Sequence, residues 1–264
     1  MKLPLYQIDA FTTRLFGGNP AAVVLLDAWL PDRVLADIAA ENNLAETAFV
    51  IPRADVSPLR WFTPAVEVDL CGHATLAAAD VLFRYRFPSL ARLAFSTRSG
   101  ELVVTREGRL LKMDFPARPG QPVAVTDALA AALGAQPLEA YLARDLLAIF
   151  GSESDVRSLR PDFARVAALD AFAVIVSAPG DTVDFVSRFF APGAGIPEDP
   201  VTGSSHCTLT PYWAARLNKN KLMAKQLSAR GGDLLCELRG ERVVIAGEAV
   251  EYLRGEIETE QPAI

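Results

Sequence analysis

The chain has 264 residues, of which 51% are apolar, and a formal net charge of −6 at pH 7. That length and apolar content suffice for one large globular domain or two smaller ones. Lys and Arg do not cluster, which disfavours nucleic-acid binding, and no apolar run has the length of a signal peptide or a membrane span. The sequence therefore predicts a cytoplasmic protein with neither a nucleic-acid nor a membrane partner.

Apolar runs predict strands in both halves of the chain. They cover residues 6–11, 21–26, 47–51, 59–63, 92–97 and 101–107 in the first half, and residues 146–150, 172–176, 187–191, 226–230 and 234–239 in the second. The apolar spacing of residues 31–43 predicts an amphipathic helix with Pro31 near its first turn. Two further predicted helices, 73–85 and 206–217, are apolar on several faces, so each is expected to lie inside its own sheet.

An internal repeat organises the chain. Residues 95–108 match residues 227–240 without a gap, at a constant offset of 132 residues. Upstream of these segments, "RWFTP" (60–64) corresponds to "RFFAP" (188–192). Two copies in the same order imply two similar domains related by an approximate two-fold axis.

The predicted domain boundary follows from this repeat. Three prolines and a glycine interrupt regular structure in "FPARPGQP" (115–122). We therefore expect domains at residues 1–118 and 119–264, with the last strand able to pack back on the first domain.

The repeat also aligns two glycine motifs, "CGHAT" around Gly72 and "TGSSH" around Gly203, each at the start of a predicted helix. The N–H groups of a first helical turn carry partial positive charge, so such an end binds anions. Two of them suit an interdomain cleft that holds a small acidic substrate. The alternative is a pair of ordinary helix caps, in which Ser204 or Ser205 would be unremarkable.

Titratable side chains near these glycines point to proton transfer. His73 titrates near neutral pH, and a helix end favours its neutral, proton-accepting form. Asp199 precedes the second helix, where a carboxylate either caps amides or acts as an acid/base. His206 lies further round its helix and is interpreted as structural.

The cysteines are constrained by their spacing and by the repeat. Three cysteines without a Cys-x-x-Cys pair, and only two histidines, predict neither a disulfide framework nor a zinc or histidine-rich metal site. A helix N-terminus lowers the pKa of a thiol, so Cys71 has the position of a possible acid/base. A two-base racemase needs a second thiol at the repeat-related position, which is Thr202. Cys71 is therefore interpreted as a small buried filler.

Four ordered motifs resemble the phenazine-biosynthesis PhzF-like family, from near the N-terminus to beyond Gly203. They are "YQIDAFTTRLFGGNPAAVVLL", "NNLAETAFV", "RWFTPAVEVDLCGHATLAAADVLF" and "EDPVTGSSH". This family shares the diaminopimelate-epimerase fold. The resemblance implies an α+β protein with two similar pseudo-two-fold-related domains, each a β-rich sheet or barrel wrapped around a central helix.

The resemblance also implies roles for individual residues. Glu46 matches the family's catalytic glutamate, and His73, Asp199 and Ser204 match other catalytic groups of the cleft. Substrate-binding positions are expected at Asn19, Gly72, Thr202 and Gly203. The implied activity is a cofactor-independent isomerisation, in which Glu46 moves a proton between carbons of a small carboxylate-bearing substrate. The resemblance also makes a homodimer plausible.

Other functions remain open at this point. Ala45 stands where the phenazine enzyme itself carries a serine, so a related small acid is expected as substrate. The same fold supports stereoinversion at an α-carbon, although the missing second thiol argues against that reaction. A non-catalytic small-acid-binding or scaffold protein is the alternative from another functional class.

Overall fold

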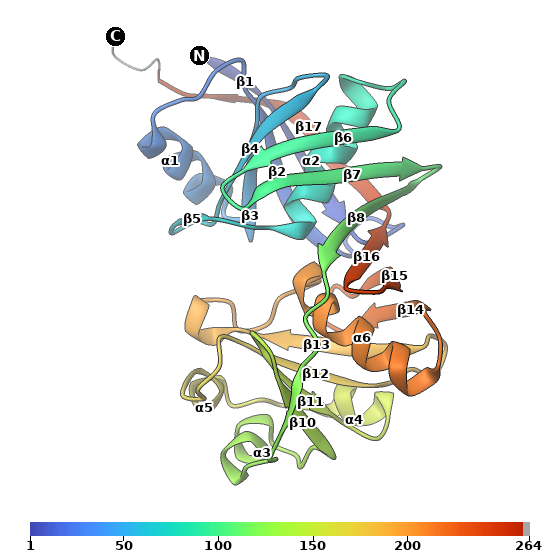
Figure 1. Ribbon diagram of the computed structural model, residues 1–264. Coiled ribbons are helices and arrows are strands. Elements are labelled where there is room, and N and C mark those ends of the chain that lie inside the picture. Colours follow the sequence, from blue (N-terminus) through green and yellow to red (C-terminus); the bar gives the residue numbers. More distant parts are fainter. Residues whose placement is uncertain (261–264) are drawn as a thin grey trace. The chain divides into compact units, whose positions relative to one another are not determined.

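The computed structural model describes residues 1–260 and divides into two compact units (Figure 1). The first unit comprises residues 1–114 together with residues 246–260 of the described chain, and the second comprises residues 115–245. The chain therefore returns to the first unit after completing the second. No helix within residues 1–260 is long and apolar enough to cross a membrane.

The first unit consists of a sheet and two helices. Its strands are β1 (Lys2–Ala10), β2 (Asn19–Leu25), β3 (Glu46–Val50), β4 (Val56–Phe62), β5 (Glu67–Val68), β6 (Arg92–Thr97), β7 (Gly100–Glu107), β8 (Leu110–Pro116) and β17 (Ala249–Glu258). Its helices are α1 (Asp32–Asn42) and α2 (Gly72–Tyr85). β8 leads the chain into the second unit.

The second unit repeats this plan with more helices. Its strands are β9 (Gln121–Val123), β10 (Glu139–Leu142), β11 (Leu146–Ile149), β12 (Val174–Pro179), β13 (Phe185–Phe190), β14 (Lys221–Gln226), β15 (Gly232–Arg239) and β16 (Arg242–Gly247). Its helices are α3 (Asp127–Leu133), α4 (Glu153–Ser158), α5 (Phe163–Ala167) and α6 (His206–Leu217), with short 3-10 turns at Pro192–Ala194 and Gly203–Ser205. β16 leads the chain back to the first unit.

Strand pairing follows the same order in both units. In the first, β17, β1 and β2 are antiparallel neighbours, β2 and β3 are parallel, β3 and β4 antiparallel, β4 and β6 parallel, and β6 and β7 antiparallel. In the second, β9 to β15 show the same alternation, with β11 parallel to β12 and β13 parallel to β14. The predicted α+β class is confirmed, and the sequence repeat corresponds to a repeated topology.

Each unit has one helix that is buried over most of its length. Every residue of α2 from His73 to Phe83 is buried, and α2 contacts β1, β2, β3 and β17. α6 lies against β14 and β15 and buries most of its first nine residues. On the opposite face of each sheet, α1 packs in the first unit and α3, α4 and α5 pack in the second. The apolar character of both long helices therefore predicted their central position correctly.

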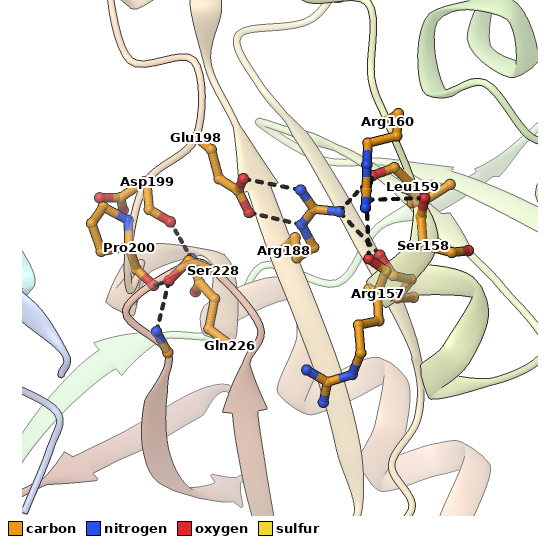
Figure 2. A network of polar contacts seen from close by, with 12 residues as sticks. Arg157, Ser158, Leu159, Arg160, Arg188, Glu198, Asp199, Pro200, Gln226 and Ser228 are labelled. Carbon is orange, nitrogen blue, oxygen red and sulfur yellow. Dashed lines mark hydrogen bonds and ion pairs between the residues drawn. The ribbon is translucent and has the colours of Figure 1, made fainter.

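A repeated ion pair stabilises corresponding strands of the two units. Arg60 on β4 donates from Nε and Nη2 to the two carboxylate oxygens of Glu67, both at 2.7 Å. Arg188 on β13 makes the same forked contact with Glu198, at 2.7 and 3.0 Å (Figure 2). Such two-bond arginine–carboxylate pairs fix geometry as well as charge. Arg60 and Arg188 are therefore equivalent positions of the repeat.

The strand predicted at 226–230 is wrong. β14 ends at Gln226, and the chain then turns, with Gly231 at φ +64°. The N–H of Gly231 donates to the carbonyl and the hydroxyl oxygen of Ser228, at 3.1 and 3.0 Å, while the Ser228 hydroxyl donates to the Pro200 carbonyl at 2.7 Å. These local bonds replace the ladder bonds that the first copy of the repeat makes up to Thr97.

Candidate active site

Strand alternation directs Glu46 and Asn19 toward the buried helix α2. Successive side chains of a strand point to opposite faces, and the odd-numbered residues of β3 after Glu46, such as Phe49, pack with α1 on the outer face. Glu46 therefore points to the inner face, and Ala21, its register partner on β2, puts Asn19 on that same face. Both side chains reach the N-terminal end of α2, where His73 lies.

Gly18 determines where strand β2 begins, with Asn19 as its first residue. The residue has φ +63°, and a Cβ added there would lie 2.1 Å from the carbonyl oxygen of Ala10. Only glycine fits this left-handed turn against another strand. The "GGNP" sequence thus places Asn19 opposite Ala10, at the first position of β2.

His73 lies at the centre of a buried polar cluster in the first unit. Its Nε2 is 3.1 Å from Oε2 of Glu46, the distance of an ion pair without the alignment of a hydrogen bond. Its Nδ1 is 3.2 Å from Nδ2 of Asn19 and 3.5 Å from Sγ of Cys71. The exposed fractions are 9% for Glu46, 6% for His73 and Cys71, and 0% for Asn19. The imidazole therefore lies between a carboxylate on one side and an amide and a thiol on the other.

The charge states in this cluster differ from the helix-end expectation. Burial raises the pKa of the Cys71 thiol, and the carboxylate of Glu46 raises it further, so the thiol is neutral. Burial by itself lowers the pKa of His73, but the neighbouring Cys71 and Glu46 outweigh it and hold that pKa above the ordinary 6.5. Because the thiol is neutral, we assign the effect to Glu46. His73 is thus a proton donor toward Glu46, whereas the helix end alone predicted a neutral base.

The same residues could be mistaken for a metal site. Within the described chain, Glu46, Cys71 and His73 each offer one potential ligand atom, and these atoms lie within 4.8 Å of one another. However, Cys71 faces Nδ1 of the ring and Glu46 faces Nε2. An ion uses only one nitrogen of an imidazole, so one of these two neighbours would face the nitrogen that the ion leaves unbound. The arrangement suits proton transfer along the ring.

A second cluster in the other unit surrounds the glycine motif at Gly203. The hydroxyl of Thr202 donates to Oδ2 of Asp199, and the N–H of Thr202 donates to Oε1 of Gln226 at 2.9 Å. Gln226 is fully buried, and its Nε2 donates to the Asp199 carbonyl at 2.8 Å (Figure 2). This glutamine, at the end of β14, holds the loop from Asp199 to Thr202 in place.

Ser204 extends this second cluster toward a fixed guanidinium group. Nη2 of Arg144 lies 3.5 Å from the Ser204 hydroxyl. Arg144 also binds the buried carboxylate of Asp145 through Nε and Nη2, both at 2.9 Å, and stacks over Phe172. No sequence pattern indicated Arg144 or Gln226, because a charged loop residue and a polar strand end are common.

His206 is structural, as the sequence predicted. Its Nδ1 is 2.9 Å from the carbonyl oxygen of Thr202, and its exposed fraction is 0%. Burial lowers its pKa to about 4, so the ring is neutral at physiological pH. Nδ1 therefore carries the proton and donates to Thr202.

The eight predicted site residues form two clusters, one in each unit. Asn19, Glu46, Gly72 and His73 belong to the first, and Asp199, Thr202, Gly203 and Ser204 to the second. The two copies of the repeat can be aligned with Arg60 on Arg188 and Gly72 on Gly203. In this alignment the two clusters contain different residues at equivalent positions. The strand registers then place Ala173 at the position of Glu46, and Ser204 follows Gly203 as His73 follows Gly72. The carboxylate and the imidazole of the first unit have no counterpart at these positions.

Known proteins resemble this chain along almost its whole length. A family model described as "Phenazine biosynthesis-like protein" matches residues 8–255. A Pseudomonas aeruginosa protein named an uncharacterized isomerase is 55% identical over 258 residues, covering 97% of this chain and 99% of the relative. A crystal structure of a PhzF-family phenazine biosynthesis protein from Enterococcus faecalis has a TM-score of 0.96 at 48% identity, covering 98% of this chain and 100% of the other.

More distant structures share the architecture. A hydroxyproline epimerase from Agrobacterium vitis, crystallised with trans-4-OH-L-proline, has a TM-score of 0.62 over 99% of this chain and 94% of its own. Its sequence identity is 11%, so the likeness concerns the fold alone. The epimerase-like fold that the sequence motifs implied is confirmed.

Proposed function

The chain belongs to the phenazine biosynthesis-like protein family, and from that premise we propose that it is an isomerase in which Glu46 moves a proton between carbons of a small carboxylate-bearing substrate. The observation that carries this proposal is the buried contact of 3.1 Å between Glu46 and His73. A base that abstracts a proton from carbon needs a dry site, and the side chains of His73 and Glu46 are only 7% and 12% exposed.

The proposed chemistry is balanced within the substrate. The Glu46 carboxylate takes a proton from one carbon, and the electron pair of the broken C–H bond delocalises toward an adjacent unsaturated group. Glu46, now a carboxylic acid whose proton can exchange with solvent, returns a proton to another carbon, so the product is an isomer. His73 stabilises, through its Nε2–H, the negative charge that develops on the substrate. The first-turn amides of α2, beginning at Gly72, contribute partial positive charge.

The residues of the second cluster are assigned from the family resemblance. We propose that Asp199 and Ser204 assist proton transfer and that Thr202 and Gly203 bind the substrate acid. The guanidinium group of Arg144, 3.5 Å from the Ser204 hydroxyl, supports an anion-accepting position there. Asn19 is fully buried against His73, and its predicted contact with substrate stays a prediction.

Solvent exchange tests the proposal even though the substrate is unidentified. The purified protein is incubated in D2O with a panel of small unsaturated and hydroxylated carboxylic acids, and carbon-bound deuterium is followed by NMR. We expect at least one acid to gain deuterium or to shift a double bond. Binding by some acids with no exchange in any would favour the non-catalytic alternative.

Product stereochemistry separates isomerisation from stereoinversion. An epimerase of the two-base type needs an acid/base from each side of the carbon. The first unit carries both Glu46 and His73, whereas Ala173 and Ser204 occupy the related positions of the second. We therefore expect a positional isomer as product, and chiral chromatography showing only an inverted centre would contradict this.

A further inference from the structure

The tautomer of His73 depends on the groups that face its two ring nitrogens, Glu46 at Nε2 and Asn19 at Nδ1. We infer that Asn19 is a positioning residue that keeps the proton of neutral His73 on Nε2, the ring nitrogen that faces Glu46. This inference rests on the proposed function, because it concerns the same site. It gives Asn19 a role in directing the proton, beside the direct substrate contact predicted from the sequence.

The geometry on the Nδ1 side carries the inference. Nδ2 of Asn19 lies 3.2 Å from Nδ1, and the side chain is fully buried at the start of β2. An amide NH2 group only donates hydrogen bonds, so in this orientation of the Asn19 amide Nδ1 accepts and does not carry the proton of a neutral ring. The proton then lies on Nε2, 3.1 Å from the Glu46 carboxylate.

Cys71 does not make this choice. Its thiol lies 3.5 Å from Nδ1 and is neutral, because burial and Glu46 raise its pKa. A neutral thiol is both a weak donor and a weak acceptor, so it tolerates either tautomer. Glu46 from β3 and Cys71 from the segment before α2 are the titratable groups that act on the ring. Glu46, which can only accept at Nε2, and Asn19, whose NH2 group faces Nδ1, therefore act together to distinguish the two nitrogens.

The amide also allows the ring to gain a proton without moving. In the imidazolium both nitrogens donate, so Nδ1–H needs an acceptor. Rotation of the Asn19 amide by half a turn exchanges its nitrogen and oxygen, which have similar size, and presents Oδ1 to Nδ1–H. His73 thereby keeps its position relative to Glu46 in both protonation states.

NMR of the two histidines tests this inference without any substrate. The chain contains only His73 and His206, so ring ¹⁵N labelling yields two sets of signals. His206 is an internal reference of the opposite tautomer, because its Nδ1–H donates to Thr202. Above its titration midpoint, His73 should show a protonated Nε2 and an unprotonated Nδ1.

Two substitutions of Asn19 separate positioning from packing. Asn19→Leu removes the donor at Nδ1 and leaves only Glu46 to select the tautomer, so the neutral ring with its proton on Nδ1 should become detectable. Asn19→Asp, nearly isosteric, adds an acceptor and a negative charge and should raise the titration midpoint of His73 by about 1–3 pH units. In both variants an unchanged melting temperature reports an intact fold, and if Asn19→Leu fails this check, Asn19→Asp provides the test.

Two results would overturn the inference. One is a neutral His73 with its proton on Nδ1 in the unmodified protein. The other is an Asn19→Asp midpoint equal to that of the unmodified protein, with Cys71→Ala shifting the tautomer instead. Because no substrate is involved, the inference can fail while Glu46-dependent exchange persists, and the reverse also holds.

Discussion

His73 and Glu46 form a buried pair, with Nε2 and Oε2 3.1 Å apart, although they are 27 positions apart in the sequence and lie on a helix and a strand. The pair exists because α2 is enclosed by the sheet that carries β3. The consequences of this pair for stability, pH dependence and activity can be measured separately.

The first consequence is a loss of stability at alkaline pH. The pKa of His73 in the folded chain is raised above the ordinary 6.5, so the folded chain binds this proton more tightly than the unfolded chain does. This contribution is complete below pH 6.5 and declines as the pH rises through the folded value. Urea denaturation at a series of pH values from 6.5 upward should show that the free energy of unfolding falls. The fall should be smaller in His73→Gln than in the unmodified protein. Parallel curves for the two proteins would contradict the assignment.

His206 should act in the opposite direction. Its folded pKa of about 4 lies below the ordinary 6.5, so the unfolded chain takes up a proton first as the pH falls. Stability is therefore lost between pH 6.5 and 4, by up to about 3 kcal/mol for a shift of this size. The acid limb of the stability curve should be shallower in His206→Asn. An equally steep acid limb in that variant would assign the loss to carboxylates alone.

The Arg188–Glu198 pair should be important for the second unit. Arg188 also donates to the carbonyl oxygens of Val156 and Leu159, at 3.1 and 3.0 Å. Arg188→Met leaves Glu198 and both carbonyls without this donor, so we expect a loss of about 2–4 kcal/mol in the free energy of unfolding. The exposed Arg33→Met on α1 is a matched control and should change stability by less than about 0.5 kcal/mol. Equal effects of the two substitutions would show that the pair contributes little.

The cysteines should be unreactive in the native protein. All three are buried, and burial raises the pKa of Cys207 to about 11 and that of Cys236 to about 12. The thiolate is the reactive species, so a disulfide reagent such as DTNB should react slowly until denaturant is added. Three equivalents should then react. Rapid native reaction at Cys71 would instead support a thiolate acid/base.

Much of the fold was predictable because the same order of sequence patterns occurs twice in the chain. Aromatic strand, glycine motif, apolar helix and paired strands recur in order, and both copies have the same strand pairing. The prediction failed at 226–230, where Ser228 and Gly231 form a turn whose partner, Pro200, is distant in sequence. Local patterns do not contain such a contact.

The site was less visible from the residues alone. Glu46 lies between "NNLA" and "TAFV", where a single sequence suggests a solvated loop residue, and only the family resemblance identified it. Its burial depends on the packing of α2 against β3, which no local pattern encodes. The charge of His73 was predicted from the helix end, but a carboxylate at 3.1 Å has the larger effect.

The most direct test of the proposed chemistry is solvent-deuterium exchange in Glu46→Gln, measured on any acid that the unmodified protein labels. The matched control is Glu41→Gln, which changes an exposed glutamate on α1 five positions away. Glutamine keeps the size of the side chain but cannot accept the proton, so we expect exchange to fall by at least about 100-fold with little change in melting temperature. Glu41→Gln should exchange at the unmodified rate. Full exchange in Glu46→Gln would contradict the central claim that Glu46 carries the proton.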